Sequence, residues 1–307
     1  MTKKTIIITG ASGFVGAALI KQAAKDGNRV IALKRESSDL TRIKNVKGVY
    51  LFNYETLLEK KNLQKIKSLK PDIFIHAAWQ GVGGKDRNEL FQITNNLPFT
   101  LDLVQLAYDV GCAHWIGIGS QAEYGNPNQK VDELFPTNPT TLYGKSKVAT
   151  SWSALGLCQA SGMTGSWVRL FSPYGPDDNP DWFIPYVIKE LSQGRAPKLT
   201  KCEQLWDYLY IDDVATGILS VAYANAPGIF NLGSGKAVPL RKIIEIIQKL
   251  VNPKIQPQFG AIEYRPDQVM HLEADIRKIK KITGWTPQTN LKQGLEKTVQ
   301  WFQHPNN

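Results

Sequence analysis

The feature that most constrains the fold is a glycine-rich turn near the N-terminus, within the segment Thr5–Gly16, TIIITGASGFVG. The β-branched run before the turn predicts a buried strand, and the apolar spacing from Ala17 to Ala23 predicts a helix after it. Gly10 permits a tight turn, Gly13 lets a ligand approach the backbone, and Gly16 lets the helix pack on the strand. Backbone N–H groups at the positive end of a helix dipole bind anions, so the segment predicts a pyrophosphate site. The alternative is the same strand, turn and helix without a ligand.

Length and composition fit an ordinary globular protein of one large domain or two closely joined ones, with 307 residues of which 42% are hydrophobic. No apolar run approaches the length of a membrane span. Lys3 and Lys4 precede only the short run Ile6–Ile8, which predicts a strand rather than a signal peptide. The three cysteines are odd in number and widely spaced, which favours free thiols over disulfides or a zinc site. We therefore expect a cytoplasmic protein with no metal site and no membrane insertion.

The net charge of +10, from 37 basic and 27 acidic residues, has more than one explanation. Such a charge can attract nucleic acid or an anionic surface. Many of the lysines, however, lie on predicted exposed helices, such as the stretch Lys60–Lys70, and no basic–aromatic binding pattern is present. We expect no nucleic-acid partner. The positive electrostatic field of the protein would instead attract a polyanionic small-molecule substrate.

Strand and helix patterns alternate through the first half of the chain. This alternation predicts a Rossmann-type α/β fold, a doubly wound parallel sheet with right-handed crossovers. After the first strand, the predicted strands are Arg29–Leu33, Gly48–Phe52, Pro71–His76, Trp115–Gly119 and Ser166–Leu170, and the predicted helices are Leu57–Leu69, Asn88–Val110 and Tyr143–Ala160.

The pattern loosens after Phe171, where segments rich in Pro, Gly and Asp begin. From Ser234 onward we expect helices joined by proline turns. The sequence therefore predicts a dinucleotide-binding domain of residues 1–172 and 207–233, and a smaller, discontinuous C-terminal α/β substrate-binding region of residues 173–206 and 234–307. Within the later part, the predicted elements are the helices Ile184–Ser192, Val214–Tyr223 and Leu291–Phe302 and the strands Tyr208–Ile211 and Gly228–Leu232.

The end of the second predicted strand indicates which dinucleotide binds. In this fold an acidic residue about twenty positions beyond the glycines accepts the ribose 2′-hydroxyl of NAD, whereas a basic residue accommodates the 2′-phosphate of NADP. Lys34 and Arg35 follow the strand, and the first carboxylate, Glu36, comes only after them. A point charge and a planar guanidinium both suit a phosphate dianion, so we expect NADP(H), with NAD(H) possible. The alternative is two basic residues at an exposed strand end.

A second group of residues suggests acid–base chemistry. Tyr143 and Lys147 lie one turn apart at the start of a predicted helix, on the same face. A phenol with an ordinary pKa near 10 is a poor catalyst at neutral pH, and a neighbouring ammonium lowers that pKa. Ser120 follows the fifth strand, where ligands bind in open α/β sheets. We expect His76 to pack at a strand end rather than catalyse, and the tryptophans 79, 115, 152 and 301 to pack in the core or loops.

Motifs spread over nearly the whole chain resemble those of extended short-chain dehydrogenases/reductases, in the NAD(P)-dependent epimerase/dehydratase family. Two further segments, Phe183–Tyr186 and Phe259–Arg265, resemble the nucleotide-sugar 4-ketoreductases of the CDP-abequose synthase-like and dTDP-4-keto-6-deoxyhexose reductase-like group. The motifs are Thr9–Gly16, Ile75–Ala78, Asn96–Thr100, Ser120–Gly125, Tyr143–Lys147, Arg169–Pro176, Asp212–Ala215, Asn231–Gly233 and Gly284–Pro287.

The resemblance implies a role for each matching residue. The catalytic residues would be Ser120, Tyr143 and Lys147, and the substrate would contact Ser120, Gln121, Ser172 and Arg265, with Arg265 clasping the diphosphate. Asn96 would also support the active-site backbone. The cofactor would contact Thr9, Gly10, Ser12, Gly13, Phe14, Val15, Gly16, Lys34, Arg35, Asn53, Ala77, Ala78, Asn96, Tyr143, Lys147 and Phe171.

Departures from the family pattern reduce the number of reactions that the chain is expected to catalyse. Dehydratases of this family carry Asp and Glu just after the serine position, where this chain has Gln121 and Ala122. Trp206 stands where relatives often have a second arginine for the diphosphate, and Ser172 replaces a frequent Asn near the sugar. The resemblance, with the NADP-type strand end, implies NADPH-dependent reduction of a dTDP- or CDP-linked 4-keto-6-deoxyhexose for surface polysaccharide such as O-antigen.

Several alternatives stay open. An NAD-dependent nucleotide-sugar 4-epimerase or dehydratase would share the motifs, a dinucleotide-sensing regulator would share the fold, and a reductase of an aldehyde or phenolic ketone would ignore nucleotide diphosphates. Relatives are commonly dimers through the helices near Asn88–Val110 and Tyr143–Ala160, so we expect a homodimer.

Overall fold

A seven-stranded parallel sheet forms the centre of the protein, with the strand order β12-β7-β5-β4-β1-β2-β3. The computed structural model describes residues 3–57, 59–266 and 268–304, so the ends of the predicted domains at residues 1 and 307 lie outside it. The order reverses between β1 and β4, and at such a point ligands bind outside the carboxyl ends of the strands. The strands are β1 (Thr5–Thr9), β2 (Arg29–Lys34), β3 (Val49–Asn53), β4 (Ile73–His76), β5 (His114–Ser120), β7 (Thr164–Leu170) and β12 (Gly228–Leu232).

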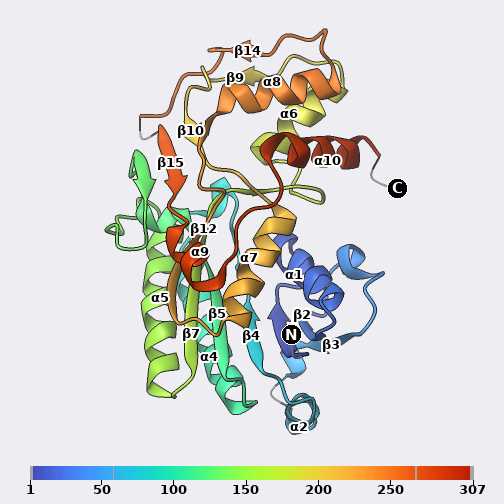
Figure 1. Ribbon diagram of the computed structural model, residues 1–307, viewed down its shortest axis with the longest axis vertical. Helices are drawn as coiled ribbons and strands as arrows, with labels where there is room; N and C mark the ends of the chain where they lie inside the picture. The colour runs from blue at the N-terminus through green and yellow to red at the C-terminus, as the bar shows by residue number, and fades with distance from the viewer. Residues whose placement is uncertain (1–2, 58, 267, 305–307) are drawn as a thin grey trace.

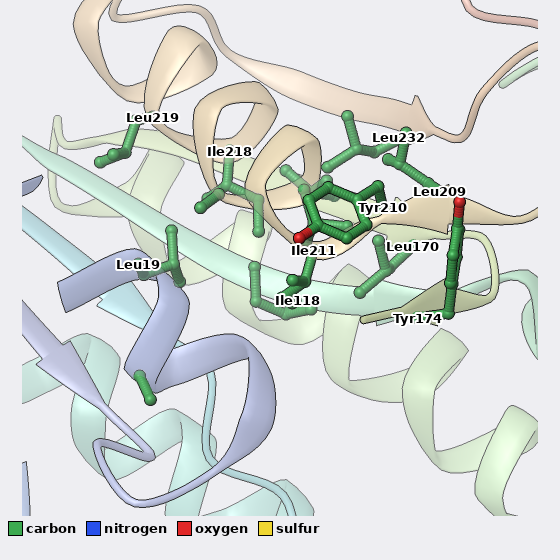
Figure 2. Close-up of a cluster of buried hydrophobic side chains, with 14 of the residues drawn as sticks. Leu19, Ile118, Leu170, Tyr174, Leu209, Tyr210, Ile211, Ile218, Leu219 and Leu232 are labelled. Carbon is green, nitrogen blue, oxygen red and sulfur yellow. The ribbon is translucent and has the colours of Figure 1, made fainter. Parts of the chain in front are cut away.

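Helices cover both faces of this sheet (Figure 1). Successive residues of β1 point to opposite faces, so Ile6 and Ile8 pack into one core while Ile7 packs into the other. Figure 2 shows part of the first core, where Leu19 lies near Ile218. The predicted doubly wound Rossmann-type fold is confirmed. The first core includes α1 (Phe14–Lys25) and α7 (Ile211–Tyr223), and the second includes α2 (Lys60–Ser68), α4 (Asn96–Asp109) and α5 (Leu142–Ala160).

The predicted single helix Asn88–Val110 is wrong. A short helix, α3 (Phe91–Thr94), ends before α4 begins, and Asn95 between them has φ −108° and ψ −53°. Pro98 is the third residue of α4, and a proline there lacks the N–H that would continue the ladder and crowds the carbonyl four residues earlier. The helix therefore breaks at the residues before this proline.

Two other predictions about elements fail. The predicted strand Tyr208–Ile211 is only Leu209–Tyr210 (β11), because α7 already begins at Ile211. Asp212 and Asp213 lie in the first turn of that helix, where carboxylates complement the helix dipole. Trp152 does not pack in the core or a loop as predicted, because it lies on α5 with 73% of its surface exposed.

The C-terminal region contains strands as well as helices, contrary to the prediction of helices alone after Ser234. A four-stranded sheet joins four segments in the order β13-β10-β15-β6, and helices α6 (Phe183–Ser192), α8 (Leu240–Val251) and α10 (Leu291–Gln303) lie at one end of the molecule in Figure 1. Most of these strands are too short to show the alternation of apolar and polar residues by which a strand is predicted from sequence. They are β6 (Gln129–Val131), β10 (Leu205–Trp206), β13 (Val238–Pro239), β15 (His271–Ala274) and, in two smaller pairs, β8 (Pro173–Tyr174) with β11 and β9 (Lys198–Leu199) with β14 (Gln258–Phe259).

Candidate active site

The glycine turn between β1 and α1 has the close packing that its three glycines predict. Gly10 has φ +72°, and a Cβ there would lie 2.9 Å from the backbone of Ala77 and Ala78. A Cβ on Gly16 would lie 2.0 Å from the carbonyl oxygen of Gly10. Gly13 is the N-cap of α1, and no side chain caps the helix or places an acid in its first turn. This backbone cradle with free N–H groups at a helix N-terminus fits a pyrophosphate.

An arginine that the sequence analysis missed braces this turn. Arg42 donates hydrogen bonds to the carbonyl oxygen of Ser12 at 2.8 Å and to that of Asp177 at 2.7 Å. It thus ties the turn to the loop after β8. Phe14 and Val15, two further predicted cofactor residues, are half-buried in the first turn of α1 beside it.

Thr9 links the ends of β1 and β4. Its hydroxyl oxygen accepts hydrogen bonds from the backbone N–H groups of Ala77 at 3.1 Å and Ala78 at 3.2 Å. The same oxygen lies 2.9 Å from Nδ1 of His76, and Nε2 of His76 lies 3.1 Å from the hydroxyl of Thr100. Burial and the charge of Lys147 lower the pKa of His76 to about 3. His76 is therefore a neutral, fully hydrogen-bonded strand-end residue, as expected.

Asn96 holds the chain that follows β4. Its side-chain oxygen accepts from the backbone N–H of Gln80 at 2.9 Å, and its amide nitrogen donates to the carbonyl of Gln80 at 3.0 Å. Such a two-way contact holds the two peptide groups on either side of Gln80, at the start of the segment Gln80–Lys85. This geometry agrees with the expected support of the active-site backbone by Asn96.

The basic residues expected at the cofactor's ribose lie together at one edge of the sheet. Lys34 ends β2 and is in register with Asn53, which ends β3. Arg35 is exposed, and Lys34 donates to its carbonyl oxygen at 3.3 Å. Among the described residues neither cation forms an ion pair, so both charges are available to an anion.

Ser120, Tyr143 and Lys147 meet at the end of β5. The N-terminus of α5 is capped by Thr141, whose hydroxyl accepts from the N–H of Gly144 at 3.2 Å. A Cβ on Gly144 would lie 2.6 Å from the carbonyl oxygen of Ala122, so glycine lets the helix approach the chain after Ser120. The Ser120 hydroxyl hydrogen-bonds the Tyr143 phenol, and Tyr143 is buried.

Charges around the Tyr143 phenol oppose each other. Burial raises its pKa, the hydrogen bond with the Ser120 hydroxyl and the charge of Arg87 lower that pKa, and the charge of Glu123 raises it. The Arg87 guanidinium carbon lies 5.3 Å from the centre of the Tyr143 ring. The sequence analysis missed Arg87 and expected Lys147 to supply the lowering charge. In this structure Lys147 instead donates to the carbonyl oxygen of Ile118 at 2.6 Å.

The comparisons with known proteins place this geometry in a family. The model described as "NAD dependent epimerase/dehydratase family" matches residues 6–233. The chain belongs to this family. It is 27% identical to the UDP-glucuronate 4-epimerase of Thermodesulfobacterium geofontis, over 96% of this chain and 95% of that protein. It is also 27% identical to the CDP-abequose synthase of Salmonella typhimurium, over 97% and 98%.

Solved structures show the same fold. The UDP-N-acetylglucosamine 4-epimerase from Methanobrevibacter ruminantium M1, solved in complex with UDP-N-acetylmuramic acid, superimposes with a TM-score of 0.88 at 21% identity, covering 99% of this chain and all of that one. The expected resemblance to the epimerase/dehydratase family and to CDP-abequose synthase is thus confirmed. Within the described part of the chain, every helix is too short or too polar to span a bilayer.

Beneath the site of this epimerase/dehydratase chain lies a buried ion pair that sequence reasoning missed. The carboxylate of Glu123 accepts from the Arg169 guanidinium at 2.8 Å, from the indole N–H of Trp167 at 2.9 Å and from the backbone N–H of Ser120 at 2.9 Å. Arg169 also donates to the Tyr124 hydroxyl at 2.9 Å. A capping box, an acid three residues after a serine, is the sequence signal that could have found Glu123.

The predicted substrate residues are not all brought together. Gln121 accepts a hydrogen bond from Ser120 at 3.1 Å, and Ser172 accepts one from the indole N–H of Trp206 at 2.6 Å. Phe171 is fully buried after β7. Arg265 is exposed in the segment after β14, and among the described residues its guanidinium has no ion-pair or hydrogen-bond partner. No contact joins Arg265 to the Ser120–Tyr143–Lys147 group in this structure.

Proposed function

We propose that this protein is an NADPH-dependent reductase of the 4-keto group of a dTDP- or CDP-linked 4-keto-6-deoxyhexose. The observation that carries the proposal is the convergence of Ser120, Tyr143 and Lys147 at the end of β5. The glycine turn and its arginine brace supply the anion-binding half of the same crevice. Reduction of a carbonyl needs an oxygen-orienting donor and a proton donor, and these residues supply both.

Under this proposal, each residue of the site would have its own role in the reaction. When bound, the nicotinamide would supply the hydrogen and the electron pair, which is the hard chemistry of the reaction. Ser120 would hydrogen-bond the substrate carbonyl, and the Tyr143 phenol would donate the proton to the developing alkoxide. Lys147 would hold the nicotinamide ribose and keep positive charge near Tyr143. Lys34 and Arg35 would bind the 2′-phosphate, and Asn53 would hydrogen-bond the adenine.

Two sequence features favour reduction over the alternative, an NAD-dependent 4-epimerase or dehydratase. The basic end of β2 suits NADP better than NAD, and Gln121 and Ala122 replace the acids that assist water elimination in dehydratases. The relative named UDP-glucuronate 4-epimerase is as similar as the relative named CDP-abequose synthase, so similarity favours neither reaction.

The remaining expectations belong to the same proposal. Residues 1–172 and 207–233 would form the cofactor-binding domain, and residues 173–206 and 234–307 would bind the nucleotide sugar, with Arg265 moving to the diphosphate. The enzyme would act in the cytoplasm as a homodimer, and its product would enter a surface polysaccharide such as O-antigen.

A spectrophotometric assay tests the proposal. Purified protein is mixed with NADPH or NADH and a panel of 4-keto-6-deoxy sugar nucleotides carrying dTDP, CDP or GDP. We expect loss of NADPH absorbance with at least one substrate, and its abolition in Tyr143→Phe at unchanged NADPH affinity. Protein that retains NAD(H) and interconverts sugar nucleotides without consuming NADPH would favour the epimerase instead.

A further inference from the structure

Trp79 lies in this site but has no role in the proposed reaction. The Nζ of Lys147 lies 3.5 Å from the centre of the Trp79 ring, which is close even for a contact between a cation and an aromatic face. The Trp79 ring also packs edge-on against Tyr143, with ring centres 6.1 Å apart. One indole therefore touches both partners of the Tyr–Lys pair.

A buried glutamine fixes the orientation of this indole. The Trp79 N–H donates to the side-chain oxygen of Gln92 at 2.8 Å, and Gln92 is fully buried. The same oxygen accepts from Asn96 at 3.2 Å, and the Gln92 amide nitrogen donates to the carbonyls of Gly81 and Asp86. Because every polar atom of Gln92 is used, the ring has little freedom to turn away from Lys147.

The surroundings of Lys147 offer the ammonium few other partners. The residue is 4% exposed, and among the described residues its Nζ has one hydrogen bond, to the carbonyl of Ile118 at 2.6 Å. The ring centres of Trp167 and Tyr143 lie farther from Nζ than that of Trp79, at 5.7 and 5.8 Å. The titratable groups that face it are His76, which is neutral, the Tyr143 phenol and the carboxylate of Glu123, which is already paired with Arg169. A buried ammonium in such a place depends on whatever attraction its neighbours provide.

We propose that Trp79 is a positioning residue for Lys147: its π-face holds the ammonium at the active site and stabilises the charged form. This inference takes the role of Lys147 from the proposed function. Burial lowers the pKa of Lys147 to about 7, so its charge at neutral pH is finely balanced. Loss of the ring's attraction would lower that pKa further and leave more of the lysine neutral.

Fluorinated tryptophans test this inference without changing the packing much. Fluorine withdraws electron density from the indole face, so cation binding weakens in steps while ring size is nearly kept. Tryptophans with one, two and three fluorines are incorporated at position 79 alone. The pKa of Lys147 is measured in the protein without substrate by NMR of ε-labelled lysine, with Lys147→Met identifying the signal. We expect the pKa to fall stepwise, by about one unit at full fluorination.

Trp152 supplies the matched control, because it lies on the same helix as Lys147 but is exposed. Fluorination of Trp152 should leave the Lys147 pKa unchanged. Trp79→Phe should give a Lys147 pKa between that of the wild type and that of the fully fluorinated protein, because a phenyl face binds cations less well than an indole. The inference is overturned if fluorination of Trp79 does not change the Lys147 pKa, or if fluorination of Trp152 changes it by the same amount.

The readout separates this inference from the proposed function. If the Lys147 pKa shifts as expected but no 4-keto sugar nucleotide is reduced, the reductase proposal fails and the role of Trp79 stands. If reduction occurs, the same fluorinated proteins should show the basic limb of their kcat/KM profile moved to lower pH, because activity falls as Lys147 loses its proton.

Discussion

At the scale of single residues, Gly16 has the least space for a side chain of the three glycines in the turn after β1. A side chain there would meet the Gly10 carbonyl oxygen, which is backbone and cannot rotate away. The turn would have to open, and the N–H groups proposed to bind the pyrophosphate would lose their arrangement. Geometry at this position therefore supports both the fold and the proposed cofactor site.

We predict that Gly16→Ala lowers the free energy of unfolding by about 3 kcal/mol and weakens NADPH binding at least tenfold. Urea denaturation and fluorescence titration measure the two effects. Gly156→Ala is the control, because a Cβ on Gly156 meets nothing within 4 Å in α5, so this change should stabilise by about 0.5–1 kcal/mol. Tight NADPH binding by Gly16→Ala would contradict the assignment of the turn.

At the scale of elements, one face of α5 carries residues of the candidate active site and another face is exposed. Tyr143 and Lys147 are buried on it, whereas Trp152 and Leu157 are exposed. α4 packs beside α5 and exposes Tyr108. Exposed large side chains on neighbouring helices are compatible with the homodimer interface proposed for these helices.

We predict that Trp152→Glu converts a homodimer into a monomer, because a carboxylate at the centre of an apolar interface stays unpaired when buried. Size-exclusion chromatography with light scattering measures the mass of each form. Leu134→Glu, at an exposed leucine that belongs to neither helix, should leave the dimer intact. A wild-type protein that is already monomeric would refute the expected homodimer.

Sequence patterns predicted the elements that carry a local signal and missed those that depend on distant parts of the chain. Parallel strands such as β4 and β5 are continuous apolar runs, and the spacing of Tyr143 and Lys147 is local to one helix. The Glu123–Arg169 pair joins positions 46 apart, and Arg42 braces a turn 30 residues before it. Trp79 was predicted only to pack in the core or a loop, and its contact with Lys147 was missed because nothing in its neighbours along the chain indicates a cation above its ring.

At the scale of the whole molecule, a buried carboxyl couples stability to pH. Asp178 lies in the loop between β8 and α6 and is 9% exposed, and within the described part of the chain its carboxylate accepts one hydrogen bond, from the N–H of Asn179 at 2.8 Å. Burial raises its pKa from 3.8 to about 7. The folded protein thus holds this proton more tightly than the unfolded chain, so its stabilising contribution is full below pH 3.8 and is lost as pH rises to about 7.

We predict that Asp178→Asn removes this dependence. The free energy of unfolding of the variant relative to wild type should increase by roughly 4 kcal/mol between pH 4 and pH 7, because the amide cannot ionise. Urea denaturation of both proteins across this range measures the difference. The buried His76 and His114 titrate with the opposite sign but are common to both proteins, so they cancel. A constant difference between the two curves would show that Asp178 does not titrate there.

The pairing of β6 with β15 ties the reaction centre to the far end of the chain. β6 is the next strand after Ser120 along the chain, and it is paired in parallel with β15, with Lys130 beside Glu273 in an ion pair of 2.9 Å. The segment that follows Ser120 is therefore joined to the C-terminal region by the hydrogen bonds between β6 and β15. Under the proposed function, contacts of the C-terminal region with the nucleotide would help to position Ser120, so we expect a substrate that lacks its nucleotide to be turned over slowly even when its ketone fits.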